Sequence, residues 1–314
     1  MTSNEQPYTL VLTHDIDHIS LRKYPVLSNI TLEFFKRCLW INFLRMIRGE
    51  LRPWQYFESL KWCIFYPFIK IGLLEDPWEK SMKTMLDIEK KHGVRSTLFF
   101  IPFKDKHGQI REGVLAKGRA IKYDIRDYKD LLNSLEENGW EVGVHGINAH
   151  LSLESAKEEL EVIKSLLPFK KKIGIRMHWL FKSDKLWKNL KAAGYFYDST
   201  FGSNEEIGFP DGKDKPFIID GIHVIPLTIQ DGALLGYKHK SWFKANPKAM
   251  NPWGRIEQIL DNAKKNNSVV TILWHNNAFG VYHYHEDLYV RILNQAKLDG
   301  ARICRCIDVL DAPS

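Results

Sequence analysis

Two aspartates that follow an apolar run are the residues of this chain best suited to chemistry. Tyr8 to Leu12 is apolar and leads directly into Thr13-His14-Asp15-Ile16-Asp17. If this run is a buried strand, its period of two places Asp15 and Asp17 on one face and His14 on the other. Two close carboxylates repel each other, so a division of labour is expected, in which one binds a cation and the other titrates or pairs with a base. The alternative is that both acids only cap the strand and its turn.

Further polar residues follow other apolar runs in the same way. They are His145 and His150 after residues 141–144, Arg176 and His178 after 173–175, Asp198 after 195–197, Asp231 after 224–227, and His275 after 271–274. A carboxylate and two imidazoles with an open position for water suit zinc or another divalent ion. The strand ends therefore predict a metal site.

The segments that must position these residues alternate between helical and extended patterns. Helices are predicted at 77–91, 128–138, 154–167, 184–193 and 256–265, and strands at 96–101, 140–144, 173–176, 195–197 and 269–274. This rhythm indicates an α/β fold with parallel strands and crossover helices. Ligands of such folds, whether barrels or open sheets, bind beyond the carboxyl ends of the strands.

The composition is that of a globular protein. The chain has 314 residues, of which 44% are hydrophobic, and we expect a single α/β domain over residues 1–314. Residues 1–7 lack the pattern of a secretory signal, and no apolar run approaches the roughly twenty residues that span a bilayer, so a cytoplasmic protein is expected. The four cysteines show no metal-binding or redox spacing and are expected to be reduced thiols.

A basic and aromatic stretch follows the first predicted strand. Residues 20–70 contain nine Lys or Arg and three acidic residues, which accounts for most of the net charge of +7. Apolar residues recur there at helical spacing, which predicts a helical insertion over residues 20–80. One interpretation is peripheral contact with an anionic membrane, at its inner face for a cytoplasmic protein. The other is an insertion that packs its aromatics onto the core; nucleic acid is not expected as a partner, because no binding motif accompanies the charge.

The strand-end motifs resemble those of the polysaccharide deacetylases, the metal-dependent carbohydrate esterases of the NodB-homology fold. Their first motif, Thr-Phe-Asp-Asp-Gly, is similar to residues 13–17, as in a divergent branch with a His-Asp-x-Asp motif. The resemblance implies that Asp15 is the catalytic base and Asp17 a metal ligand. The family motif His-Ser/Thr-x-x-His is similar to residues 145–150, with one extra residue between the imidazoles. It implies that His145 and His150 are metal ligands, with Asn148 as the alternative to His150.

Three later segments extend the resemblance over most of the chain. The family's Arg-x-Pro-Tyr is similar to Arg176-Met177-His178-Trp179, in which the arginine would pair with the catalytic aspartate. Leu-x-His matches residues 273–275, so His275 would protonate the departing amine, and Asp198 lies where an acid of the active site is expected. Residues expected to contact substrate are His178, Trp179, Asn276 and Asp231.

The resemblance implies a distorted (β/α) barrel of the NodB-homology type, with the helical insertion after its first strand. It also implies a hydrolase that uses one divalent ion, Zn first and Co, Ni, Mn or Fe as alternatives, to remove an N-acyl group, most simply acetyl. The substrate would be an N-acylated sugar of a cell-surface polysaccharide or a glycan precursor. Two other interpretations stay open: a noncatalytic carbohydrate-binding relative, and a nucleotide-sugar glycosyltransferase that uses Asp15-Ile16-Asp17 as its Asp-x-Asp motif.

Overall fold

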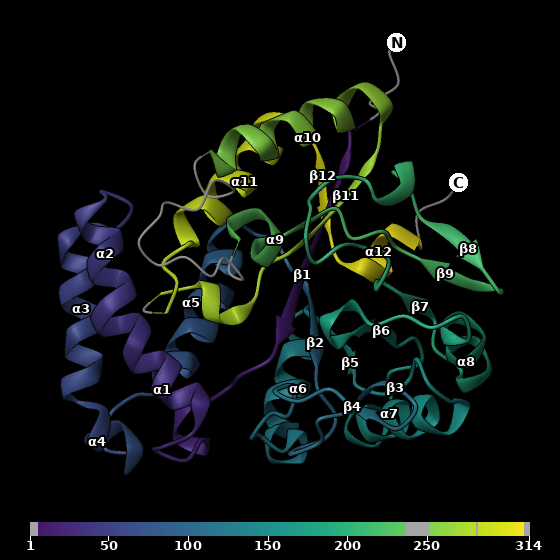
Figure 1. Cartoon of the computed structure of the whole chain (residues 1–314). Helices are drawn as coiled ribbons and strands as arrows, with labels where there is room; N and C mark the ends of the chain where they lie inside the picture. The colour runs from purple at the N-terminus through teal and green to yellow at the C-terminus, as the bar shows by residue number, and fades with distance from the viewer. Residues whose placement is uncertain (1–5, 237–250, 281, 311–314) are drawn as a thin grey trace.

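The computed structural model describes residues 6–236, 251–280 and 282–310. Its centre is a ten-stranded, mostly parallel sheet in the order β10-β11-β1-β2-β5-β6-β7-β9-β8, in which β12 also pairs with β1 (Figure 1). The strands are β1 (Thr9–Ile16), β2 (Thr97–Phe100), β5 (Glu141–Gly146), β6 (Gly174–Met177), β7 (Tyr197–Asp198), β8 (Phe217–Ile219), β9 (Ile222–Val224), β10 (Ile229–Gln230), β11 (Val269–Leu273) and β12 (Arg302–Cys304). The expected parallel α/β architecture is thereby confirmed.

Helices connect and cover these strands. They are α1 (Asn29–Lys36), α2 (Asn42–Ile47), α3 (Pro53–Ile64), α4 (Tyr66–Lys70), α5 (Pro77–Lys91), α6 (Lys129–Glu137), α7 (Leu153–Leu166), α8 (Leu186–Ala193), α9 (Asp231–Leu235), α10 (Pro252–Asn266), α11 (Glu286–Leu298) and α12 (Cys306–Leu310). A small antiparallel hairpin, β3 (Gln109–Arg111) and β4 (Val114–Leu115), lies outside the main sheet. The ends of α5 are encoded locally, since Asp76 caps its first turn through the Trp78 N–H and Pro77 occupies its first position.

The sheet is curled. Val11, Phe99 and Tyr197 belong to β1, β2 and β7 and pack in one small apolar cluster, although β7 is not a neighbour of β1 or β2 in the sheet. Leu10 and Leu12, which alternate with Val11 along β1, lie instead in the main core against the helices. The odd-numbered side chains of β1 therefore point to the concave side, and this direction leads to Asp15 at the end of the strand.

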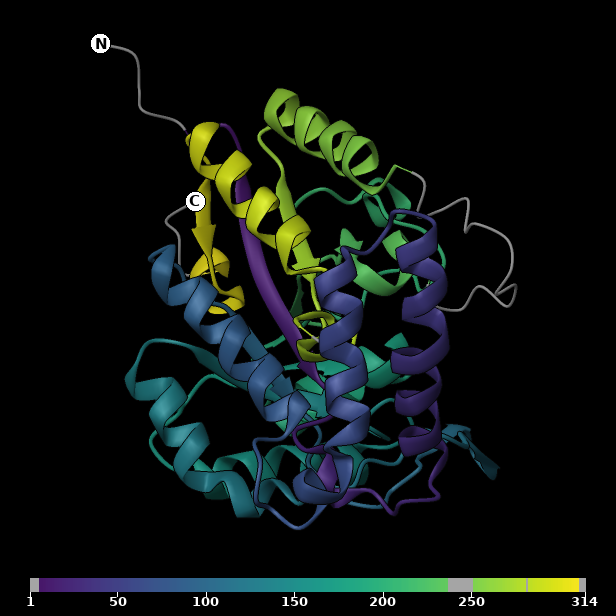
Figure 2. The same ribbon diagram turned by 90° about the vertical axis from the view of Figure 1, so that its left-hand side faces the viewer.

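The connection from β1 to β2 contains α1 to α4 before the crossover helix α5. The π-helical segment η2 (Arg37–Ile41) joins α1 to α2, and the resulting long helix lies beside α3 at one flank of the sheet (Figures 1 and 2). A separate apolar cluster holds this unit to the rest of the chain, through Phe34 and Tyr66 from the unit itself and Trp78 and Tyr284 from outside it. No helix in the described residues is both long enough and apolar enough to cross a membrane.

Candidate metal and catalytic site

Asp15 and Arg176 form a buried ion pair. Arg176, at the end of β6, donates from Nη1 to Asp15 Oδ1 at 3.0 Å and to Thr13 Oγ1 at 2.7 Å. Its Nε and Nη2 donate to the carbonyl and hydroxyl oxygens of Ser199 at 3.0 and 2.8 Å. Four hydrogen bonds therefore fix the guanidinium, which in turn fixes and neutralises one oxygen of Asp15. The pairing of arginine with the first aspartate was expected from the family resemblance.

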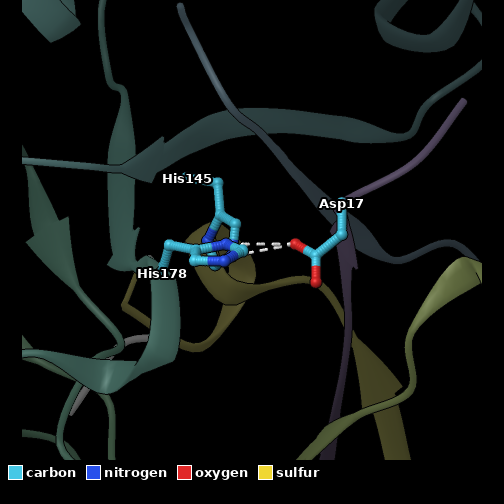
Figure 3. A group of neighbouring side chains, drawn as sticks. All are labelled: Asp17, His145 and His178. Carbon is cyan, nitrogen blue, oxygen red and sulfur yellow. Dashed lines mark ion pairs between the residues drawn. The ribbon is translucent and has the colours of Figure 1, made fainter. Parts of the chain in front are cut away.

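Asp17 faces two histidines from neighbouring strand ends (Figure 3). Asp17 Oδ1 lies 3.4 Å from His145 Nε2 and 3.2 Å from His178 Nδ1. Each of the three residues offers a ligand atom, and these atoms lie within 4.8 Å of one another. His145 is in β5 and His178 directly follows β6, which pairs with β5 in parallel register. The carboxyl ends of adjacent strands thus bring together a ligand set of one carboxylate and two imidazoles.

The atoms of this cluster fit a divalent cation. Asp17 Oδ1 and His178 Nδ1 are buried and have no hydrogen-bond partner in the described structure, a costly arrangement unless another group satisfies them. His145 Nδ1 lies 2.9 Å from the Arg176 carbonyl oxygen. A proton on that nitrogen leaves Nε2 with a free lone pair toward Asp17, the usual orientation of a metal-binding histidine.

The protonation of the cluster also suits a cation. Burial lowers the pKa of His178 to about 4, despite the opposing effect of Asp17, so its ring is neutral at pH 7. Burial raises the pKa of Asp17, but the interactions of its carboxylate with His178, His145 and His275 outweigh this and hold that pKa well below its usual range. A neutral imidazole and an ionised carboxylate are the forms that bind metal.

His275 lies on the other side of Asp17 and is paired with a buried acid. Asp231 Oδ1 is 2.6 Å from His275 Nδ1, and Asp231 Oδ2 accepts the His275 backbone N–H at 2.9 Å. Burial lowers the pKa of His275, but Asp231, with contributions from Asp17 and Asp15, raises it to about 10. The remaining nitrogen, Nε2, lies 3.8 Å from Asp17 Oδ2. Asp231 was expected to contact substrate; the structure instead places it behind His275, where it orients the ring and holds it protonated.

His150 does not join the cluster. Its Nε2 lies 3.3 Å from the Ile110 carbonyl oxygen in the β3–β4 hairpin, and its ring packs edge-on against Phe181. The alternative ligand, Asn148, accepts the Gln109 backbone N–H through its side-chain oxygen. The extra residue between the two histidines turns the chain away from the site. His178, expected to contact substrate, occupies the position that was predicted for His150.

Asp198 is a buried residue of β7 whose side chain bonds to two neighbouring segments. Its Oδ1 accepts the backbone N–H of Thr200 at 3.1 Å and also the Thr200 hydroxyl, while Oδ2 accepts Trp187 Nε1–H at 3.1 Å. Burial raises the pKa of Asp198 to about 6, although these hydrogen bonds oppose the shift. Within the described residues, the hydrogen-bond partners of Asp198 are thus Thr200 and Trp187 and not the metal ligands. These contacts do not support the catalytic role that was predicted for Asp198.

The remaining predicted residues differ in their access to a substrate. Trp179 is 44% exposed and its ring stacks on His178 at a centroid distance of 5.7 Å. Asn276 is fully buried and donates from Nδ2 to the His18 carbonyl oxygen. Trp179 therefore lies where a substrate could contact it, whereas Asn276 fixes the segment that follows His275.

Two buried charged residues support the site and gave no recognisable signal in the sequence. Arg119 donates to the backbone carbonyls of His178 at 2.7 Å and Ile147 at 3.1 Å. Glu159, in α7, accepts the backbone N–H groups of Ile147 and Asn148 at 3.0 and 2.6 Å. Together they hold the turns after His145 and around His178. Neither lies in a motif or at a predicted strand end, and only their three-dimensional contacts identify them.

Comparisons with known proteins agree with the architecture. No family model matches the sequence, and no curated protein matches it either. The structure of a candidate polysaccharide deacetylase from Mycobacterium smegmatis is similar, with 13% sequence identity, 98% of this chain and 91% of that chain covered, and a TM-score of 0.54. The structure of Puue allantoinase is also similar, with 11% identity, 98% and 90% covered, and a TM-score of 0.56. The chain therefore has the fold that the M. smegmatis protein and this allantoinase share, which confirms the fold expected from the polysaccharide deacetylase resemblance.

Proposed function

We propose that this chain is a metal-dependent amidohydrolase of the polysaccharide deacetylase type. It removes an N-acyl group, acetyl in the simplest case, from a sugar of a cell-surface polysaccharide or its precursor. One observation carries the proposal: a cluster with unsatisfied buried ligand atoms, at Asp17 Oδ1 and His178 Nδ1, adjoins both an Asp15–Arg176 pair and a His275–Asp231 pair. A ligand set, a carboxylate base and an imidazolium acid are the three parts that metal-assisted amide hydrolysis requires.

Asp17, His145 and His178 would hold the cation. Two imidazoles and one carboxylate are donors typical of catalytic zinc sites, and Co, Ni, Mn or Fe can use the same donors. When bound, the cation supplies an activated water at neutral pH and polarises the amide carbonyl of the substrate. The chain's own residues must then move the protons.

Asp15 is the proposed base. Arg176 occupies Asp15 Oδ1, so Oδ2, which lies 3.6 Å from His145 Nε2, is the oxygen that accepts a proton. The arginine also stabilises the ionised carboxylate before the reaction. The scaffold residues Thr13 and Ser199 hold this arginine in place.

His275 is the proposed acid. With Nδ1 bonded to Asp231, its protonated Nε2 is directed to the side of Asp17 and is available to the leaving nitrogen. Amine expulsion needs such a proton, because an amide nitrogen leaves poorly as an anion. The exposed ring of Trp179 beside His178 offers a flat apolar surface for the sugar.

The test is hydrolysis of N-acetylated glucosamine oligomers by the zinc-loaded protein, followed by the release of acetate and of free amine. Asp15→Asn should keep the metal and lose turnover by roughly a hundredfold or more, whereas Asp17→Asn should lose both. An Asp15→Asn protein as active as wild type would contradict the assignment of the base.

The noncatalytic alternative predicts metal binding and sugar binding without release of acetate from any N-acetylated sugar. In the glycosyltransferase alternative, Asp15 and Asp17 would both bind the metal ion that holds the diphosphate of the sugar donor. Asp15 is instead engaged by Arg176, and only Asp17 belongs to the three-residue ligand set, which favours separate roles for the two acids.

A further inference from the structure

Exposed large apolar side chains are concentrated in the helical unit α1 to α4 and in the segments that flank it. Fourteen of the 21 large hydrophobic side chains that are exposed in the described residues lie between residues 26 and 74. We call this surface the insertion face; it consists of Val26, Leu27, Leu32, Leu39, Trp40, Ile47, Trp54, Phe57, Ile64, Phe65, Phe68, Ile71, Leu73 and Leu74. A concentration of this kind marks a binding surface rather than the scattered apolar residues of an ordinary exterior.

The contact between α2 and α3 is polar, whereas the unit packs against the rest of the chain through the apolar cluster of Phe34 and Tyr66. Asn42 in α2 donates to the hydroxyl of Ser59 in α3 at 2.9 Å, and both side chains are buried. Arg45 is also buried and donates to the carbonyl of His283 at 2.9 Å, and buried Gln55 accepts the Tyr284 hydroxyl through its backbone carbonyl. A water-soluble pair of helices has the opposite arrangement, with apolar residues between the helices and polar residues outside. At the α2–α3 contact this arrangement is inverted, as expected if the outer face of these two helices meets an apolar medium.

The stripe on α3 and α4 shows this pattern residue by residue. Trp54, Phe57, Lys61 and Ile64 are all exposed, and their spacings of three, four and three residues place them along one side of α3. Phe68 is also exposed and lies in α4, after the helix break at Phe65. The buried residues Gln55, Ser59 and Tyr66 lie about half a turn away. The exposed apolar side chains are therefore one continuous stripe.

The long helix α1–α2 contributes to the same face. Trp40 contacts Phe43 with ring centroids 6.3 Å apart, Phe43 contacts Tyr56 of α3 at 5.6 Å, and Tyr56 contacts Phe57 at 5.9 Å. This row of rings connects exposed Trp40 on one helix to exposed Phe57 on the next. The side-by-side course of the two helices is visible in Figures 1 and 2.

The charge around the face is positive. The three acidic residues in 20–70 each pair with a basic one, as Glu33 with Lys36, Glu50 with Arg48, and Glu58 with Lys80. Three of the nine basic residues pair with acids outside this range, namely Arg22 with Asp76 and Glu79, Lys23 with Asp127, and Arg52 with Asp287, so the positive excess is smaller than the composition alone suggests. Lys61 lies within the apolar stripe and is exposed. A lysine in this position extends its charged end to lipid phosphates while its methylene chain stays with the apolar groups.

We propose that the insertion face binds the surface of an anionic lipid bilayer. The helices lie in the plane of the headgroups, with Trp54, Phe57, Ile64 and Phe68 among the acyl chains and the basic residues at the phosphates. None of the described helices can span the bilayer, which agrees with in-plane binding. A second copy of the chain is a less suitable partner for this face, because self-association would bring two positively charged surfaces together and they would repel each other. The proposal does not depend on the proposed hydrolysis.

The test is co-sedimentation of the full chain with vesicles of phosphatidylcholine alone or with about one third phosphatidylglycerol. The wild type should bind the anionic vesicles, and added salt should weaken the binding. The triple variant Trp54→Ser, Phe57→Ser, Ile64→Ser should bind roughly tenfold more weakly or worse. Because these side chains are exposed, the variant should keep its fold, which circular dichroism and thermal melting would verify.

The matched control replaces three apolar residues elsewhere on the molecule that are at least as exposed on average, Phe169→Ser, Ile218→Ser and Leu298→Ser. It should bind vesicles as the wild type does. The proposal is overturned if the wild type ignores anionic vesicles or if both triple variants bind equally. A wild-type dimer in light scattering that dissociates in the Trp54/Phe57/Ile64 variant, without vesicle binding, would assign the face to a second copy instead.

Discussion

The protonation state of His275 gives the most quantitative prediction, and Asp231→Asn is the change that tests it. Asp231 contacts the ring through Oδ1 at 2.6 Å and, with smaller contributions from Asp17 and Asp15, raises the pKa of His275 from about 6.5 to about 10, against the effect of burial. That difference corresponds to roughly 5 kcal/mol in favour of the imidazolium. The asparagine has nearly the same shape but no charge. Without the carboxylate, burial opposes only the smaller contributions of Asp17 and Asp15, so the pKa of His275 should fall toward its ordinary value.

The assay is an NMR titration of the His275 ring in the metal-free protein. Wild-type His275 should stay protonated through pH 8, whereas in Asp231→Asn it should lose its proton near pH 6.5. The stability that this pair contributes is complete below pH about 6.5 and is lost as the pH rises toward 10, so the two proteins should differ most in acid and least in base.

Asp198→Asn is the matched control, because Asp198 is an equally buried aspartate at another strand end and bonds to Thr200 and Trp187 rather than to His275. It should leave the titration of His275 unchanged. If Asp231→Asn titrates like the wild type, the assignment of Asp231 as the residue that keeps the acid protonated is refuted.

Three further predictions concern the surroundings of the site. In Arg176→Lys, the ammonium group cannot reproduce the four hydrogen bonds of the guanidinium, so the free energy of unfolding in urea titrations should fall by about 2 to 4 kcal/mol. An unchanged unfolding midpoint would contradict a stabilising ion pair between Arg176 and Asp15. Burial lowers the pKa of His18 to about 4, so the metal-free protein should lose stability as the pH falls from about 6.5 to 4. This residue contributes up to about 1.4 kcal/mol of that loss per pH unit. His18→Gln should therefore make urea unfolding less dependent on pH, and an equal dependence in both proteins would refute this. Trp179→Ala should raise KM for the oligosaccharide by roughly tenfold with little change in kcat, whereas a loss confined to kcat would show that the ring does not hold the sugar.

Much of the fold could be predicted from local patterns. The helix predicted at 77–91 has those bounds in the structure, because Asp76, Pro77 and the apolar periodicity all act within the segment. The strand alternation also placed His14 and Asp15 on opposite faces: His14 bonds to Glu89 in the core, and Asp15 meets Arg176 on the concave side. These features depend on period and on chain ends, which a sequence displays directly.

The choice between His150 and His178 depends on contacts that a sequence does not display. The direction of the chain after His145 is set by Glu159, which lies in the next helix and accepts two backbone N–H groups of the turn. The resemblance to the family motif implied His150, with a spacing one residue longer than in the family, and in the structure its ring lies at the Ile110 carbonyl instead.

The contact of Asp231 with His275 was not predicted, for a related reason. Asp231 follows a strand of two residues, β10, and only the parallel pairing of β10 with β11 brings it behind His275. A strand so short leaves almost no periodic signal. Such pairwise contacts between distant segments decided the roles that the sequence could not assign.

The most direct test of the account is the metal content of the purified protein, measured by elemental mass spectrometry. We expect about one divalent ion per chain in the wild type and in His150→Gln, and its loss in Asp17→Asn and His178→Gln. Retention in His178→Gln with loss in His150→Gln would contradict the ligand set, and a wild type that takes up no zinc, cobalt, nickel, manganese or iron would contradict the metal site itself.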